Sequence, residues 1–253
     1  MDSKNTIMSN ILFAHYERLL RLGSDWSVTD VRVDDIHDTL HIYVIYNKNY
    51  WSDPTSGEMI KIHDLRSDRV WRHLDIMEHC TFIHCRLPRI RTSGGHYLTI
   101  SADWAEAGFS HTKKFENKCV LTLQSTYCQK AAATLMDISD DKMCSIMHNS
   151  VQRGLSERDI SQIDQISIDE KSYAKGHVYI SVLSDSKTGT VLDIVKDRTE
   201  SAATTLINKV FDTDQLFQIK ATCCDMWDAY INTLKKTVQM PNWFMINFTL
   251  SSI

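Results

Sequence analysis

The chain has 253 residues, of which 43% are hydrophobic and 24% are charged. That is the composition of an ordinary globular protein, with enough length for one large domain or two to three small ones. The formal net charge of −4 argues against a uniformly basic protein that coats nucleic acid, but it leaves room for a local basic face.

The charge is unevenly distributed along the chain. Lys and Arg outnumber Asp and Glu in residues 60–91, whereas acids outnumber bases in residues 137–200. No apolar run approaches the ~20 residues of a membrane span, and the N-terminal residues lack the pattern of a signal peptide. The seven cysteines show no metal-clip or redox spacing. We therefore expect a cytoplasmic protein, not bound to membranes, with reduced thiols packed as small hydrophobes.

The first part of the chain is predicted to be β-rich. An amphipathic helix over residues 6–21 comes first, within an N-terminal segment of residues 1–23. Pro54 and Gly57 mark a loop, and Gly94 with Gly95 marks a turn. Residues 24–111 form one predicted module. Its predicted strands are residues 27–33, 39–46, 59–63, 70–74, 80–91 and 96–101.

A helical part follows, over residues 112–155, and is compatible with a helix-turn-helix. The predicted helices are residues 114–125, 129–136 and 141–154. In the third helix, Met143, Met147 and Val151 recur at a spacing of four and predict a buried face. Asp140 is the predicted N-cap and Gly154 the predicted stop. Residues 156–164 are polar and predict a linker.

The last part, residues 165–253, begins with a short apolar strand that ends in Asp169 and Glu170. Two further strands follow in a hairpin, and Thr199 with Glu200 opens a helix. The remaining predicted elements are a strand over 218–224, a helix over 228–237 and an apolar run over 243–250. A carboxylate on a first buried strand, then a hairpin and a helix, is typical of ribonuclease-H-like nucleotidyl-transfer cores. The predicted fold class is mixed α/β.

Several motifs together resemble the transposases of the ISL3 insertion-sequence family. The most specific are DEKS at residues 169–172 and DMW at residues 225–227. The likeness extends over residues 64–242 in the same order of elements. The other stretches that carry it are residues 71–75, 87–91, 103–106, 115–116, 179, 197–200 and 230–231.

The resemblance implies a zinc-ribbon-like module, a helix-turn-helix and a ribonuclease-H-like domain with an Asp, Asp, Glu set. It also implies DNA cleavage and strand transfer at the inverted repeats of a mobile element. Asp169 and Asp225 match the first two acids, which would hold Mg²⁺ (or Mn²⁺) for two-metal phosphodiester chemistry. From the residues alone, Asp169 could merely end a strand and Asp225 could cap a helix. Glu170 is expected to face away from Asp169.

The third acid has no obvious counterpart in this sequence. In the family it is a Glu on a helix well after the fifth strand, but no carboxylate follows Asp228 here. We therefore expect a C-terminally truncated chain with impaired catalysis. The alternatives are a DNA-binding fragment that competes with an intact transposase, or a hydrolase of the same fold that acts on other nucleic acid.

Zinc is not expected in the β-rich module. Residues 53–57 and 92–96, where the family's Cys-x-x-Cys clips would stand, contain no cysteine. The nearby histidines do not have the spacing of a zinc site; they are His63, His79, His84 and His96. We expect the module to be held instead by an apolar face comprising Val44, Ile62, Ile83 and Leu87.

The expected partner is double-stranded DNA, specifically the inverted repeats, in a bacterial, nucleoid-associated setting; homo-oligomers are compatible with the sequence. Phosphate contacts are predicted for a group of arginines near Trp71. They are Arg66, Arg69, Arg72, Arg86, Arg89 and Arg91. If residues 141–154 form a recognition helix, its polar face would enter the major groove. That face comprises Lys142, Ser145, His148, Asn149 and Arg153, of which Lys142, Asn149 and Arg153 are the predicted DNA contacts.

Overall fold

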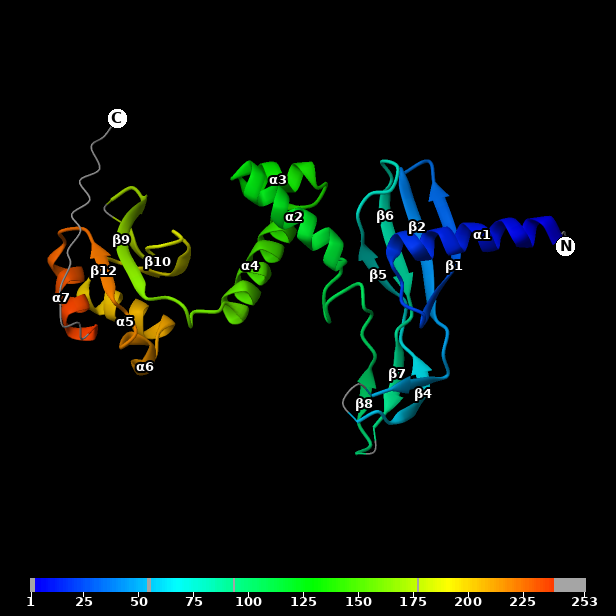
Figure 1. The fold of residues 1–253 in the computed structure, drawn as a ribbon. Helices are drawn as coiled ribbons and strands as arrows, with labels where there is room; N and C mark the ends of the chain where they lie inside the picture. The colour runs from blue at the N-terminus through cyan, green and yellow to red at the C-terminus, as the bar shows by residue number, and fades with distance from the viewer. Residues whose placement is uncertain (1–2, 54–55, 93, 177, 239–253) are drawn as a thin grey trace. The chain divides into compact units, whose positions relative to one another are not determined.

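The computed structural model describes residues 3–53, 56–92, 94–176 and 178–238 (Figure 1). The predicted apolar strand over residues 243–250 lies outside them. The chain divides into two compact units, Met1–Val151 and Gln152–Ile253. None of the described helices has the length and apolar character needed to traverse a lipid bilayer.

The first unit starts with a helix, continues through two sheets and ends in three helices, the last of which continues past Val151 into the second unit (Figure 1). Its helices and strands are α1 (Ser3–Leu20), β1 (Trp26–Asp34), β2 (Thr39–Tyr46), β3 (Tyr50–Ser52), β4 (Met59–Leu65), β5 (Arg69–Arg72), β6 (Cys80–Cys85), β7 (Pro88–Arg91), β8 (Tyr97–Thr99), α2 (Lys113–Thr126), α3 (Gln129–Leu135) and α4 (Asp140–Glu157).

The first sheet has the strand order β1-β2-β6-β5 and carries the larger core of this unit. Its central strands β2 and β6 run parallel, and Ile42 pairs with Ile83 at their centre. Both side chains are fully buried, next to Leu40 and Trp71. Helix α1 closes this core with Leu20, so the apolar face of the helix supplies part of the burial that stabilises the sheet.

The second sheet has the order β3-β4-β7-β8, and it corrects one prediction. Residues 80–91 were expected to form one strand, but β6 pairs with β2 and β5 whereas β7 pairs with β4 and β8. The chain changes sheets at Arg86 and Leu87, immediately before Pro88, which has no N–H to continue a ladder. The predicted apolar face is divided accordingly: Val44, Ile83 and Leu87 are buried in the first core, and Ile62 is half-buried in β4.

The helices α2, α3 and α4 share a separate small core. Thr112 caps α2 by accepting a hydrogen bond from the amide of Phe115 at 3.3 Å, and Tyr127 ends that helix in the left-handed conformation. Met143 and Ile146 of α4 are fully buried in the core.

The predicted face and ends of α4 need correction. Met147 and Val151, expected to be buried with Met143, are exposed. Ser139 rather than Asp140 caps the helix, since its Oγ accepts from the amide of Lys142 at 3.2 Å. The helix also passes through Gly154 and ends at Glu157. A single glycine weakens a helix by only about 1 kcal/mol and does not have to stop it.

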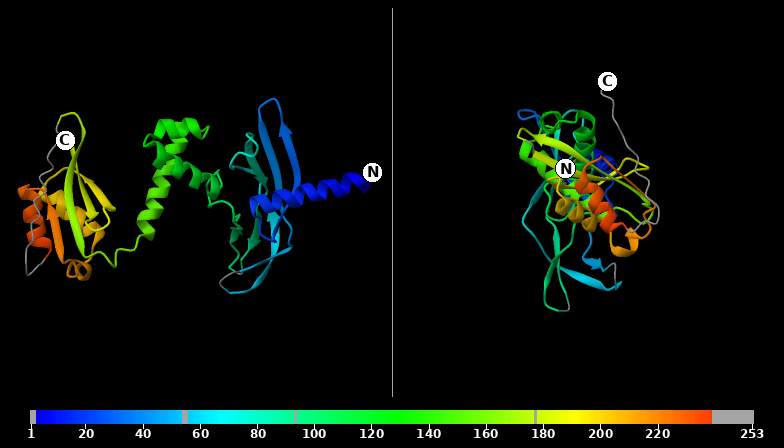
Figure 2. Two further views of the ribbon diagram at one scale, coloured as in Figure 1. Left: turned by 45° about the horizontal axis from the view of Figure 1, so that its top comes forward. Right: turned by 90° about the vertical axis from the view of Figure 1, so that its left-hand side faces the viewer.

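The second unit is a sheet covered on one face by helices (Figure 2). Its elements are β9 (Gln165–Ala174), β10 (Val178–Asp185), β11 (Val191–Lys196), α5 (Glu200–Val210), α6 (Thr213–Leu216), β12 (Ala221–Cys224) and α7 (Asp228–Thr237). The strand order is β11-β10-β9-β12, in which β9 and β10 are antiparallel and β12 runs parallel to β9.

The core of this unit lies between the sheet and helices α5 and α7. Ile166, Ile168 and Leu183 project from the sheet, and Leu206 and Tyr230 project from the two helices. Residues 156–164, expected to be a linker, contribute Ile160 and Ile163 to the edge of this core.

Candidate functional site

The two candidate acids lie on neighbouring parallel strands. Asp169 is inside β9, which continues to Ala174 rather than ending at the acids as expected, and Asp225 directly follows β12. Cys224 pairs with Ile168 in the parallel ladder, so Asp169 and Asp225 each stand one residue beyond the paired position. Adjacent strands are ~4.8 Å apart, which brings the two carboxylates to the same level of the sheet. Both residues are exposed.

Asp169 lies on the face of the sheet opposite the helices. Ile166 and Ile168 are buried beneath α5 and α7, and strand residues alternate between faces. Burial, and then the charge of Asp169, raise the pKa of the Cys223 thiol on the neighbouring strand β12. A backbone amide also orients each carboxylate. Asp169 Oδ1 accepts from the amide of Glu170 at 2.8 Å, and Asp225 Oδ1 from the amide of Met226 at 2.6 Å.

Asp225 is not a helix cap. Helix α7 begins at Asp228, and the residue in the N-cap position is Trp227. Asp228 is the exposed first residue of that helix. The capping explanation for Asp225, which the sequence left open, therefore does not apply.

Glu170 faces the other way and is engaged in a structural contact. It stands opposite buried Ser181 in the β9–β10 ladder, and its Oε1 pairs with Nη1 of Arg198 at 3.2 Å. The guanidinium of Arg198 lies 4.0 Å from the ring of Tyr179 and 4.4 Å from that of Trp227. The indole N–H of Trp227 donates to the backbone oxygen of Arg198 at 2.8 Å. We call these four residues (Glu170, Tyr179, Arg198 and Trp227) the Arg198 cluster. Through Arg198 it connects Glu170, which follows Asp169, with Trp227, which lies two residues after Asp225.

Sequence reasoning did not give the Arg198 cluster a role. Tyr179, Arg198 and Trp227 all belong to the motif stretches that carry the family resemblance. They could have been found by asking why an arginine and two aromatic residues accompany the acids. Their proximity follows from the order of the strands, which spacing along the chain does not reveal.

Candidate metal ligands do not form a cluster in the described part of the molecule. No group of three or more His, Cys, Asp or Glu side chains in it is arranged to hold a metal ion. Three of the histidines considered for zinc are in separate pairs: His63 with Asp64 at 3.4 Å, His79 with Asp38 at 2.5 Å, and His84 with Asp68 at 3.3 Å. His96 is exposed.

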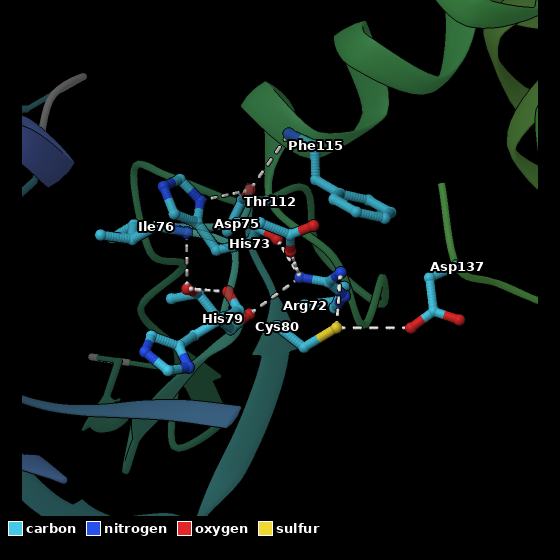
Figure 3. Close-up of polar contacts among 10 residues, drawn as sticks. Arg72, His73, Asp75, Ile76, His79, Cys80, Thr112, Phe115 and Asp137 are labelled. Atoms are coloured by element: carbon cyan, nitrogen blue, oxygen red, sulfur yellow. Dashed lines mark hydrogen bonds and ion pairs between the residues drawn. The ribbon is translucent and has the colours of Figure 1, made fainter. Parts of the chain in front are cut away.

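Arg72 was predicted to contact DNA, and the structure contradicts this (Figure 3). Its side chain is buried, with the whole residue 9% exposed. Nη1 pairs with Asp75 at 2.5 Å and donates to the backbone oxygen of His73 at 2.6 Å, while Nη2 donates to Sγ of Cys80 at 3.3 Å. The guanidinium also lies 5.0 Å from the ring of Phe115 in α2. Arg72 therefore links the first sheet to the helical part.

The other arginines differ in the partners of their side chains. Arg89 pairs with Asp64, with Nε 2.6 Å from Oδ1. Arg69 donates to the backbone oxygen of Phe109 at 3.0 Å, and Arg86 donates to that of Arg66 at 3.0 Å. Arg66, Arg86 and Arg91 are exposed.

The predicted reading face of α4 is also divided. Lys142 donates to Oγ of Ser110 at 2.7 Å, and burial lowers the pKa of its ammonium group. Asn149 and Arg153 are half-buried, whereas Ser145 and His148 are exposed. Lys142 thus anchors the helix to the loop before α2.

A comparison with known families bears on the second unit. Residues 166–246, about a third of the chain, match the family model of the ISL3-type DDE domain. The description of that family is transposase. The matched segment includes Asp169, Asp225 and the whole Arg198 cluster. No curated protein matches the chain significantly. The resemblance predicted from the sequence is therefore confirmed for this segment, and the chain carries a transposase domain of the ISL3 family.

Proposed function

We propose that the chain binds the inverted repeats at the ends of an insertion element, and that its second unit is a ribonuclease-H-like core for DNA cleavage and strand transfer. The observation that carries the proposal is the parallel register of β9 and β12, in which Asp169 and Asp225 each follow the last paired residues, Ile168 and Cys224. The strand order β11-β10-β9-β12, in which β12 is parallel to β9, supports the same core. Such a protein would act in the bacterial cytoplasm, at the nucleoid.

The two acids suit a divalent ion. Mg²⁺ prefers carboxylate oxygens and completes its shell with water and phosphate oxygens, which exposed carboxylates allow. A bound pair of Mg²⁺ or Mn²⁺ ions would activate the attacking oxygen and stabilise the leaving oxygen of the phosphodiester. Asp169 and Asp225, each oriented by a backbone amide, would supply ligand oxygens from one side. The Arg198 pair keeps Glu170 on the opposite face, so it does not compete with Asp169.

The alternative function is a DNA-binding protein that occupies element ends without cutting them and competes with an intact transposase. It is favoured by the described residues, among which no group of three or more His, Cys, Asp or Glu side chains is arranged to hold a metal ion.

The test compares the full chain with its Asp169→Ala and Asp225→Ala variants. Mn²⁺ binding is measured by electron paramagnetic resonance, and DNA binding by gel shift with element ends and random duplex. We expect each variant to lose at least about tenfold in Mn²⁺ affinity while binding element ends like the wild type. Asp228→Ala is the matched control, because this exposed acid lies three residues beyond Asp225 and should leave Mn²⁺ binding unchanged.

Three results would decide between these proposals. Equal Mn²⁺ affinity in the wild type and both variants would remove Asp169 and Asp225 from the metal site. Efficient strand transfer by the wild-type chain with Mg²⁺ would refute the alternative of binding without cutting. Equal binding to random duplex would refute recognition of element ends.

A further inference from the structure

A cavity of about 470 Å³ opens in the first unit, between the start of β5, the end of β8 and the loop that leads to α2. Its volume is within the range of small-ligand sites. The polar residues that line it are Arg66, Ser67, Arg69, Thr99, Ser101 and Glu106. The cavity belongs to the first unit, whereas the candidate acids belong to the second.

The charge of the cavity is positive. Arg66 and Arg69 line it, and the one acid among its lining residues, Glu106, is paired with Lys113 at 3.2 Å. Within the described residues, the guanidinium of Arg66 makes no hydrogen bond or ion pair, so its donors are available to a ligand. An anion would therefore meet two guanidinium groups and a neutralised carboxylate.

Arg69 is already held in position at the cavity. Its Nη2 donates to the backbone oxygen of Phe109 at 3.0 Å, and its guanidinium lies 4.9 Å from the ring of Trp71. Trp71 is 1% exposed and belongs to the core, so it provides a fixed support. A side chain that is ordered before binding loses less entropy when the ligand arrives.

Several small residues line the cavity and leave room for a bulky group. They are Ala102, Ala105, Ala107 and Gly108. Gly108 has a φ of 88°, a conformation that residues with a Cβ rarely adopt. Guanidinium groups bind phosphate oxygens in a forked geometry, and the hydroxyls of Ser67, Thr99 and Ser101 offer further donors.

We propose that this cavity seats a phosphodiester of the bound DNA, held by Arg66 and Arg69. The inference rests on the DNA binding proposed above and identifies where one such contact is made. Trp71 is too deeply buried to stack on a base, so the contact fixes the register of the DNA without reading its sequence.

The test is a salt series on the full chain. Affinity for an element-end duplex is measured by fluorescence anisotropy for the wild type and the R66Q/R69Q double variant. Removing one phosphate-neutralising side chain lowers the slope of log K against log salt by about 0.9, so the double variant should show a slope smaller by roughly one to two. R32Q/K48Q removes the same charge at two exposed residues paired with Asp30 and Asp25, and should keep the wild-type slope.

The controls separate the possible failures. Equal slopes for the wild type and R66Q/R69Q, with DNA binding intact, would overturn the cavity contact alone, whereas a wild type that does not bind DNA would overturn the proposed function as well. R66Q alone alters an exposed side chain and should fold normally, with a slope smaller by about 0.9 if the proposal holds. Tight calorimetric binding of inorganic phosphate, combined with an unchanged DNA slope in R66Q/R69Q, would assign the cavity to a free anion and overturn the proposal.

Discussion

Asp169 and Glu170 are adjacent carboxylates whose surroundings differ because strand residues alternate between faces. Asp169 is exposed beside β12, whereas Glu170 pairs with Arg198 on the side of the helices. The sequence predicted that only one of them could serve a metal site. The structure adds that Glu170 already has a partner, because Arg198 balances its charge within the fold.

A second residue-scale effect concerns His73, whose protonation should control the stability of the first unit. The imidazole is buried, and its Nδ1 lies 2.8 Å from Oγ1 of Thr112, the cap of α2. Burial, and then the charges of Lys114 and Arg72, lower the pKa of His73 from 6.5 to about 4. The unfolded chain therefore binds more protons than the folded chain between these values, and stability is lost as the pH falls through this window.

We predict that the free energy of unfolding falls by about 2 kcal/mol between pH 7 and pH 5 because of His73 alone. Urea titrations at both pH values measure the loss, and the His73→Gln variant should show a loss smaller by that amount. His96→Gln, which changes an exposed histidine, should keep the wild-type loss. Identical losses in the wild type and His73→Gln would show that this imidazole does not couple folding to pH.

At the scale of elements, local signals in the sequence were sufficient wherever neighbours along the chain decide the structure. Helix α7 has the bounds predicted for it, and Thr199 caps α5 as expected, by accepting from the amide of Ala202 at 3.2 Å. The hairpin of β1 and β2 also follows its alternating pattern. In each case the periodicity or the cap residue carries the information.

Non-local packing decides the elements that were predicted incorrectly. Residues 82–87 alternate strictly, and that alternation alone does not show that β6 and β7 join different sheets. Arg72 looked like a surface cation, yet strand β6 and helix α2 meet around it. The exposed side of α4 depends on which helices pack against it, which a spacing of four residues does not determine.

The Arg198 cluster shows how elements distant in sequence hold the candidate site together. We predict that Arg198→Gln lowers the free energy of unfolding by about 1–3 kcal/mol, since it removes two cation–π contacts and leaves Glu170 without its charge partner. A urea titration measures the change. Lys196→Gln removes the same charge from an exposed position in β11 and should have little effect. Equal unfolding free energies for the two variants would contradict a stabilising role of the cluster.

At the scale of the whole molecule, the chain combines two units with separate cores. The clusters around Ile42 and Phe115 belong to the first unit, and the cluster around Ile168 belongs to the second, where the family match lies. The sequence indicated a β-rich part, a helical part and a part with the candidate acids because each has its own periodicity. The cavity at Arg66 and Arg69 could not be predicted, because its walls come from three separate segments of the first unit.

Separate cores predict that damage to one unit stays within it. Leu206 is fully buried between α5 and the sheet, so Leu206→Ala should destabilise the second unit by about 2–5 kcal/mol. Hydrogen exchange followed by mass spectrometry should then show faster exchange in peptides from β9 to β12 and unchanged exchange in peptides from β1 to β8. Leu40→Ala, in the core of the first sheet, should give the reverse pattern, and Leu121→Ala, at an exposed position, should change neither. Faster exchange in both units after Leu206→Ala would mean that the two cores unfold as one cooperative structure.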